Sequence, residues 1–293
     1  MWFDGDNLVL ITIQALCIAL PAAGLPVWLR RYTSSAWALV LPVSIAAVVI
    51  GISEFPETAD ALTWIALFGV PVGAALAFGW ASHGARPALA LLAIPLLALA
   101  WAFPDDRFGQ LATTLLVAGS AITLGRLLAG AAPLGWIKAG VYAMAALDAY
   151  LVFSGRLQPA NHVLVTAAPA PESGLQLPQL QSAGFGTFSI GYGDYFAAAV
   201  VGGVIAAERF PGGTLRIQLA AAAALLPLAL AWDQLFLVYD VLPATIPPAV
   251  ALLGADLWMR WQRGREAPAE SETGTTHTEM QRTGASVPQS ASR

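Results

Sequence analysis

The chain has 293 residues, of which 57% are hydrophobic and only 11% are charged. Soluble domains carry roughly 25% charged residues, so this composition excludes an ordinary soluble globular protein. The net charge of −4, without a cluster of Lys and Arg, also excludes a nucleic-acid partner, because binding phosphates requires basic side chains. The expected partner is the lipid bilayer.

Nine segments are long and apolar enough to cross a hydrocarbon core of about 30 Å. The first follows the acidic stretch Met1–Asp6, where a secretory signal would be basic, so we expect it to be retained as a helix. In chain order the predicted spans are 7–28, 35–53, 61–82, 87–103, 109–130, 134–154, 185–207, 215–237 and 241–260. The predicted fold class is an all-α polytopic membrane protein with nine transmembrane helices.

Two less apolar segments divide the chain. The longest connection, 155–184, contains four prolines, and Leu175–Leu180 within it suggests a short extended piece. After the last span the composition turns to Glu, Ser, Thr and Gln, which predicts a disordered cytoplasmic tail over 262–293. We therefore expect helices 1–5 within 1–130 and helices 6–9, with the long loop, within 131–261.

The arginines are distributed unevenly among the predicted loops. Cytoplasmic loops are enriched in Lys and Arg, and most arginines follow odd-numbered spans, with Arg156 as an exception. This bias predicts an N-terminus outside the membrane and a C-terminus in the cytoplasm. The high Ala, Gly and Pro content, with no targeting sequence, favours a prokaryotic plasma membrane.

Two carboxylates fall inside predicted spans rather than at their ends. Asp148 is flanked by Met144–Leu147 and by Ala149–Val152, and Asp194 follows Gly191, Tyr192 and Gly193. A carboxylate in lipid costs a few kcal/mol unless it is paired, hydrated or protonated, so both are candidate functional residues. At 1.5 Å per residue they lie about 9 and about 14 Å below the outer surface. Consecutive antiparallel helices would therefore bring them together.

A pair of close carboxyl groups can hydrolyse a peptide bond without a metal or a cofactor. The pair holds one proton: the ionised partner activates water and the protonated partner donates to the carbonyl oxygen. Gly191 and Gly193 leave room for an extended substrate, which could pair with the Leu175–Leu180 segment. The alternative role of these glycines is close helix packing. With one cysteine and three scattered histidines, no metal site is expected.

Three segments resemble the motifs of the presenilin and signal-peptide-peptidase family of intramembrane aspartyl proteases, including its prokaryotic presenilin-like members. Gly191-Tyr192-Gly193-Asp194 matches the Gly-x-Gly-Asp motif, and Leu147-Asp148 is similar to the Tyr-Asp motif with Leu in place of Tyr. The ninth span opens with a degenerate Pro-Ala-Leu motif, in one of two registers within Pro243, Ala244, Thr245, Ile246 and Pro247.

The resemblance covers residues 134–260 and implies a function for each motif. Asp148 and Asp194 would be the catalytic pair of an endopeptidase, while Gly191–Gly193 and Pro243–Pro247 would position the substrate. The implied substrates are transmembrane helical peptides. The predicted orientation is similar to that of the signal-peptide-peptidase branch, which implies substrates such as signal-peptide remnants.

Two other functions fit part of the sequence. A transporter or channel could use Asp148 and Asp194 as a proton or cation relay. A prepilin-peptidase-like protease also has Gly-x-Gly-Asp, but that family usually has a Lys shortly after the Asp, where this chain has Tyr195-Phe196-Ala197. Among the remaining polar residues, we expect Arg126 and Lys138 to snorkel to the cytoplasmic face, and Glu208 and His162 to be solvated.

Overall fold

The computed structural model describes residues 5–55, 57–156, 177–208, 213–237 and 242–262, together with 159, 163, 164 and 167. Within these residues, five helices are long and apolar enough to cross a membrane, namely Ser35–Glu54, Thr58–Ala81, Arg107–Ala131, Leu134–Phe153 and Thr214–Trp232. Three shorter apolar helices accompany them, namely Gly5–Ala19, Pro87–Ala102 and Tyr192–Ala207. The protein is all-α, and its long apolar helices are those of a membrane protein.

These five long helices coincide with five of the nine predicted spans. In chain order the elements are α1 (Gly5–Ala19), η1 (Val27–Tyr32), η2 (Ser35–Leu39), α2 (Val40–Glu54), α3 (Thr58–Leu76), the π-helical η3 (Ala77–Ala81), η4 (Pro87–Leu92), α4 (Ala93–Ala102), α5 (Arg107–Ala131), α6 (Leu134–Phe153), β1 (Ser182–Phe185), β2 (Phe188–Gly191), α8 (Tyr192–Ala207), α9 (Thr214–Asp233), η6 (Gln234–Leu237) and a last helix over 246–262. The predicted tail from 263 onward, His162 and most of the 155–184 connection lie outside the described residues.

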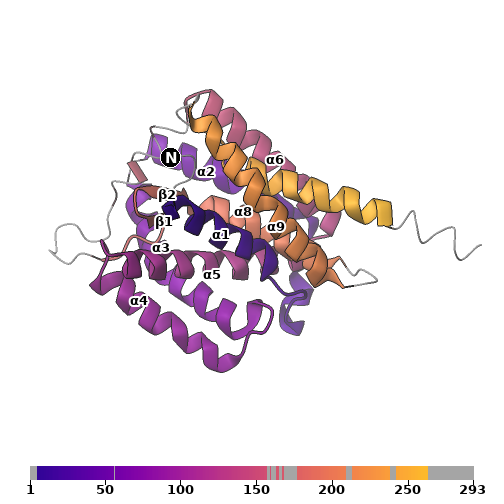
Figure 1. Cartoon of the computed structure of the whole chain (residues 1–293), viewed down its shortest axis with the longest axis horizontal. Helices are drawn as coiled ribbons and strands as arrows, with labels where there is room; N and C mark the ends of the chain where they lie inside the picture. The colour runs from indigo at the N-terminus through magenta and orange to yellow at the C-terminus, as the bar shows by residue number, and fades with distance from the viewer. Residues whose placement is uncertain are drawn as a thin grey trace, which may run out of the picture. The chain divides into compact units, whose positions relative to one another are not determined.

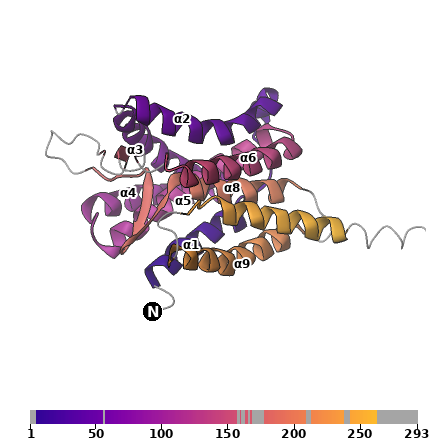
Figure 2. The same ribbon diagram turned by 90° about the horizontal axis from the view of Figure 1, so that it is seen from above.

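Helix α8 forms the centre of the first compact unit, which ends at Leu252; a second unit starts at Leu253. Every residue from Ala197 to Ala206 is buried, as expected for a helix that is apolar on all sides. Helix α8 packs against α5, α1, α6 and α9. Figure 1 shows α8 behind α1, and Figure 2 shows α6 between α2 and α8, with α1 and α9 on the opposite side of α8.

Glycines allow the helices around α8 to approach closely. A Cβ atom at Gly203 of α8 would lie 2.8 Å from the carbonyl oxygen of Gly125 in α5. A Cβ atom at the adjacent Gly202 would lie 2.8 Å from the carbonyl oxygen of Cys17 in α1. Small residues serve this purpose in membrane helices, where van der Waals packing drives association.

The first predicted span, 7–28, is too long. Helix α1 ends at Ala19, and the chain is not helical from Pro21 to Pro26. Proline has no N–H to donate and its ring clashes with the carbonyl of the preceding turn, so Pro21 stops the helix. Gly24 follows with φ of 92°, a conformation that glycine adopts without strain.

The predicted start of the seventh span at residue 185 is also wrong. Phe185–Gly191 belong to a two-stranded antiparallel hairpin, β1–β2, in which Ser182 pairs with Gly191 and Phe185 with Phe188. Its tight turn uses Gly186 at φ 61°, a conformation that glycine adopts without strain. Extended chain was predicted around Leu175–Leu180, but within the described part the strands begin at Ser182.

Arg126 holds the irregular segment after α1 in place. Its Nε donates to the carbonyl of Gly24 at 2.9 Å and its Nη2 to that of Ala23 at 3.1 Å. The third donor, Nη1, reaches the carbonyl of Trp80, whose ring lies 3.8 Å from the guanidinium carbon. The Gly24 and Ala23 carbonyls lie outside regular structure, so Arg126 supplies donors that a helix would otherwise provide.

Lys138 and Glu208, predicted to be exposed at helix ends, form an ion pair with a nitrogen–oxygen distance of 2.5 Å. Their side chains are only 17% and 14% exposed, so the pair is mostly withdrawn from solvent. Lys138 lies in the second turn of α6, and Glu208 follows the last residue of α8. The pair therefore joins the two helices that carry Asp148 and Asp194.

Replacing Lys138 by Met is expected to lower the free energy of unfolding by about 1.5 kcal/mol, since it leaves the Glu208 carboxylate in a mostly buried position. The double variant Lys138→Met/Glu208→Gln should recover part of this loss, because it removes the uncompensated charge. Thermal unfolding in detergent, followed by circular dichroism, measures both effects. Equal stability of Lys138→Met and wild type would show that the pair contributes nothing.

Candidate active site

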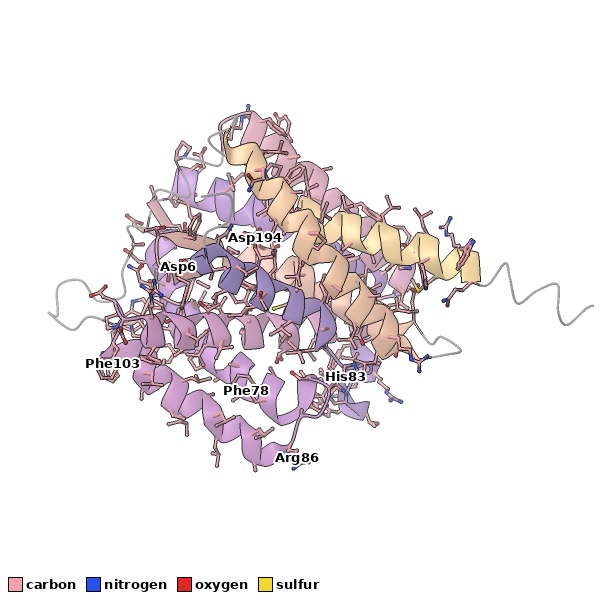
Figure 3. All side chains as sticks on the ribbon, viewed as in Figure 1. Asp6, Phe78, His83, Arg86, Phe103 and Asp194 are labelled. Carbon is pink, nitrogen blue, oxygen red and sulfur yellow. The ribbon has the colours of Figure 1, made fainter. Side chains whose placement is uncertain are left out.

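Asp194 lies in the first turn of α8, directly after strand β2, and not about 14 Å inside a helix as predicted, because the segment before it forms the hairpin. The helix begins here because Gly191 is extended, with φ −68° and ψ 153°, and a carboxylate in the first turn interacts favourably with the helix dipole. The Gly191 amide bonds to the Asp194 carboxylate. The main-chain carbonyl of Asp194 accepts from Nε2 of Gln14 in α1 at 3.4 Å. Figure 3 shows Asp194 among the surrounding side chains.

Asp148 lies in α6, five residues before the last residue of the helix, Phe153. The sequence predicted this position near the end of the span. The side chain of Asp148 is buried, with 7% of the residue exposed. Oδ2 accepts two hydrogen bonds from Thr245, one from the hydroxyl at 2.7 Å and one from the main-chain N–H at 3.3 Å. The degenerate motif before the last helix thus contacts the carboxylate of α6.

The carboxylates of Asp148 and Asp194 lie within range of a direct electrostatic interaction. Helices α6 and α8 pack against each other. Two like charges in an apolar surrounding repel strongly, so a pair of this kind holds a single proton between its members. The arrangement can therefore offer one ionised and one protonated carboxyl group to the same reactant.

The hairpin that precedes Asp194 is fixed at its turn by residues from two other helices. The Gly186 N–H donates to Oε1 of Gln110 in α5 at 2.9 Å. A Cβ atom at Gly186 would collide with the carboxylate of Asp6, which pairs with Arg107 at 3.3 Å. Because β2 leads directly into α8, these contacts also restrain the position of Asp194.

The remaining residues predicted to position the substrate, in Gly191–Gly193 and Pro243–Pro247, differ in how exposed they are and in what they contact. Gly191 and Gly193 are both exposed, and a Cβ atom at Gly193 would meet nothing within 4 Å. Tyr192 instead turns toward α5, where its hydroxyl lies 2.9 Å from Oγ of Ser120. Of the ninth-span motif, Pro243, Thr245 and Pro247 are buried, whereas Ala244 and Ile246 are partly exposed.

Gln14 is a residue at the site that the sequence interpretation missed. It is 4% exposed, lies in the middle of α1 and bonds to the main chain of Asp194. A polar side chain within an apolar span was the available signal, by the same reasoning that singled out the two aspartates. Tyr195 contributes to the same contact between α1 and α8, because its hydroxyl donates to the carbonyl of Leu10 at 3.4 Å.

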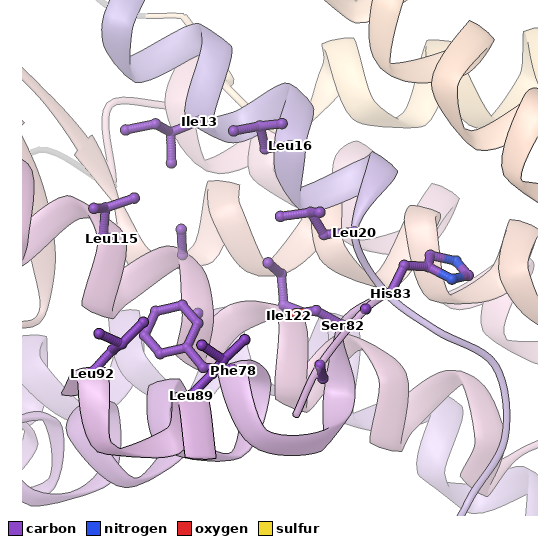
Figure 4. A pocket seen from close by; sticks show the side chains of 14 residues that line it. Ile13, Leu16, Leu20, Phe78, Ser82, His83, Leu89, Leu92, Leu115 and Ile122 are labelled. Atoms are coloured by element: carbon purple, nitrogen blue, oxygen red, sulfur yellow. The ribbon is translucent and has the colours of Figure 1, made fainter. Parts of the chain in front are cut away.

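A separate cavity of about 200 Å³ lies between α1, η3, η4 and α5 (Figure 4). Its walls are almost entirely apolar and include Leu16, Phe78, Leu89 and Ile122, with Ser82 and His83 also lining it. None of its lining residues belongs to the aspartate pair or to Pro243–Pro247. The cavity is therefore separate from the aspartate pair.

The titratable groups that the site brings together are the two carboxyls of Asp148 and Asp194. Among the residues that the structure describes, no three His, Cys, Asp or Glu side chains are grouped so as to hold a metal ion. Two carboxyls with one proton suit acid–base hydrolysis or proton transfer. Comparisons with protein-family models, with curated proteins and with solved structures find no match to the chain.

Proposed function

We propose that the protein is an intramembrane aspartyl endopeptidase, resembling presenilin and signal peptide peptidase, with nine membrane-spanning helices. The observation that carries the proposal is the meeting of two carboxylates, Asp148 of α6 and Asp194 of α8, among helices as apolar as these. A carboxylate among apolar helices is costly unless it is paired, hydrated or protonated, so two of them together mark a candidate functional site. A pair that shares one proton has the composition that peptide hydrolysis requires.

The proposed reaction uses one water molecule and returns both carboxyls to their starting states. The ionised carboxylate removes a proton from water as the water oxygen bonds to the scissile carbonyl carbon, and the protonated carboxyl gives its proton to the carbonyl oxygen. A tetrahedral diol results. The first carboxyl then protonates the amide nitrogen, the second takes a proton from a diol hydroxyl, and the carbon–nitrogen bond breaks.

A peptide bond within a helix must become extended before water can attack it. Strand β2 ends at Gly191, three residues before Asp194, and supplies extended backbone beside the pair. Ser189, Gly191 and Gly193 are all exposed, which supports access for an unwound substrate segment. The substrate would add to this extended backbone through main-chain hydrogen bonds.

The proposed setting is a prokaryotic plasma membrane with the N-terminus outside. Two sets of contacts support a common direction for α1, α5 and α8. Asp6 at the start of α1 pairs with Arg107 at the start of α5. Gln110 then binds the hairpin that leads into α8. In this orientation the substrates are transmembrane segments with a cytoplasmic N-terminus, such as signal-peptide remnants.

Cleavage of a model transmembrane peptide with a cytoplasmic N-terminus, by purified protein in detergent, tests this function. We expect cuts within the apolar segment, mapped by mass spectrometry. The same protein in liposomes with an imposed proton or sodium gradient tests the competing relay function. Ion flux that depends on both aspartates, without any cleavage, would replace the protease by a transporter or channel.

A further inference from the structure

The two carboxyls of the pair differ in the hydrogen bonds that they receive. Both bonds from Thr245 reach a single oxygen of Asp148, and Thr245 is itself only 3% exposed. The Asp194 carboxylate receives one bond, from the amide of Gly191. The pair is therefore asymmetric before any substrate enters.

The donors at Asp148 favour its ionised form. A main-chain N–H can only donate, so Oδ2 cannot carry a proton directed at the Thr245 amide. Hydrogen bonds to a charged acceptor are about twice as strong as those to a neutral one, which means that both Thr245 bonds stabilise the carboxylate more than the acid. Leu147, next to Asp148, brings no hydroxyl of its own.

We propose that Thr245 assigns the roles within the pair: it holds Asp148 as the ionised partner and leaves the shared proton on Asp194. This inference rests on the proposed function and makes Thr245 a positioning residue. Asp148 then removes the proton from water, and Asp194 gives its proton to the carbonyl oxygen. In either register of the Pro-Ala-Leu motif, Thr245 supplies a hydroxyl where the motif has an apolar residue, Leu or Ala.

The location of the proton is measurable without a substrate. Infrared difference spectra of the purified protein should show one protonated carboxyl band at neutral pH that disappears in Asp194→Asn. In the double variant Thr245→Val/Asp194→Asn the band should return, because Asp148 has lost its hydroxyl donor. Persistence of the band in the single variant Asp194→Asn overturns the assignment, whether or not the protein cleaves peptides.

The dependence of cleavage on pH supplies a second readout. In Thr245→Val the acidic limb of kcat/KM should move up by roughly 1–2 pH units, the shift that corresponds to losing a hydrogen bond to a charged group. Thr245→Ser keeps the hydroxyl and should restore the wild-type profile. An unchanged limb in Thr245→Val, or a Ser variant displaced as far as the Val variant, overturns the role of the hydroxyl. Absence of cleavage in wild type refutes the protease and leaves the infrared result decisive.

Discussion

Replacement of Asp148 or of Asp194 by Asn is expected to lower the rate of peptide cleavage by about 10³-fold or more, since each change removes one half of the acid–base pair. Asn has nearly the same shape as Asp but neither accepts a proton from water nor donates one as an acid. Both variants should unfold at or above the wild-type temperature, because Asn fills the same space without the repulsion between two close carboxyl groups. Initial rates with a fluorogenic transmembrane peptide measure the loss.

Asp60→Asn serves as the matched control, because Asp60 is an exposed carboxylate in the first turn of α3. It should cleave at the wild-type rate. The two site variants should lose the same activity singly and together, since either change disables the shared mechanism. Full activity in Asp148→Asn or in Asp194→Asn would rule out the catalytic pair.

Replacement of Gly125 by Ala is expected to destabilise the fold by about 3 kcal/mol, at the upper end of the usual cost of overpacking. A Cβ atom at this position would lie 2.8 Å from the Val200 nitrogen and still closer to the carbonyl of Ala199. All of these atoms belong to the main chain of α8, so no side chain can rotate away. Helices α5 and α8 would have to separate, which would move Asp194.

Gly69→Ala provides the comparison, because a Cβ atom at Gly69 in α3 would meet nothing within 4 Å. Alanine is favoured over glycine within a helix by up to about 1 kcal/mol, so this variant should be as stable as wild type or slightly more stable. Thermal unfolding in detergent and the rate of peptide cleavage should both fall only in Gly125→Ala. Equal unfolding temperatures for the two variants would mean that α5 and α8 are not packed through Gly125.

The helix order was predictable because the signal for it is strong along the chain. Runs of apolar residues marked the five helices that are long and apolar enough to cross a membrane, and Asp148 stands near the end of α6 as expected. The residues at which the helices begin and end were harder to predict. An apolar run does not separate helix from strand, so Phe185–Gly191 was assigned to a helix although Gly186 forms a hairpin turn there.

The contacts of the site depend on segments far apart in the sequence. The hydrogen bond from Thr245 to Asp148 joins residues 97 positions apart in the sequence, and the bond from Gln14 to Asp194 joins residues 180 positions apart. Such pairings follow from how the helices pack, which a single sequence does not encode locally. The ion pair of Lys138 with Glu208 escaped prediction for the same reason: each residue taken alone has the pattern of a solvated helix end.

That ion pair joins α6 and α8 at the ends of the two helices that lie away from Asp148 and Asp194. Counted along the helices, Asp148 is about 15 Å from Lys138, and Asp194 about 21 Å from Glu208. Because the helices are joined at one end, a tilt of a few degrees between their axes changes the distance between the two carboxyls by about 1 Å. The spacing at which one water can bridge both acids is therefore set in part at the far end of the same two helices.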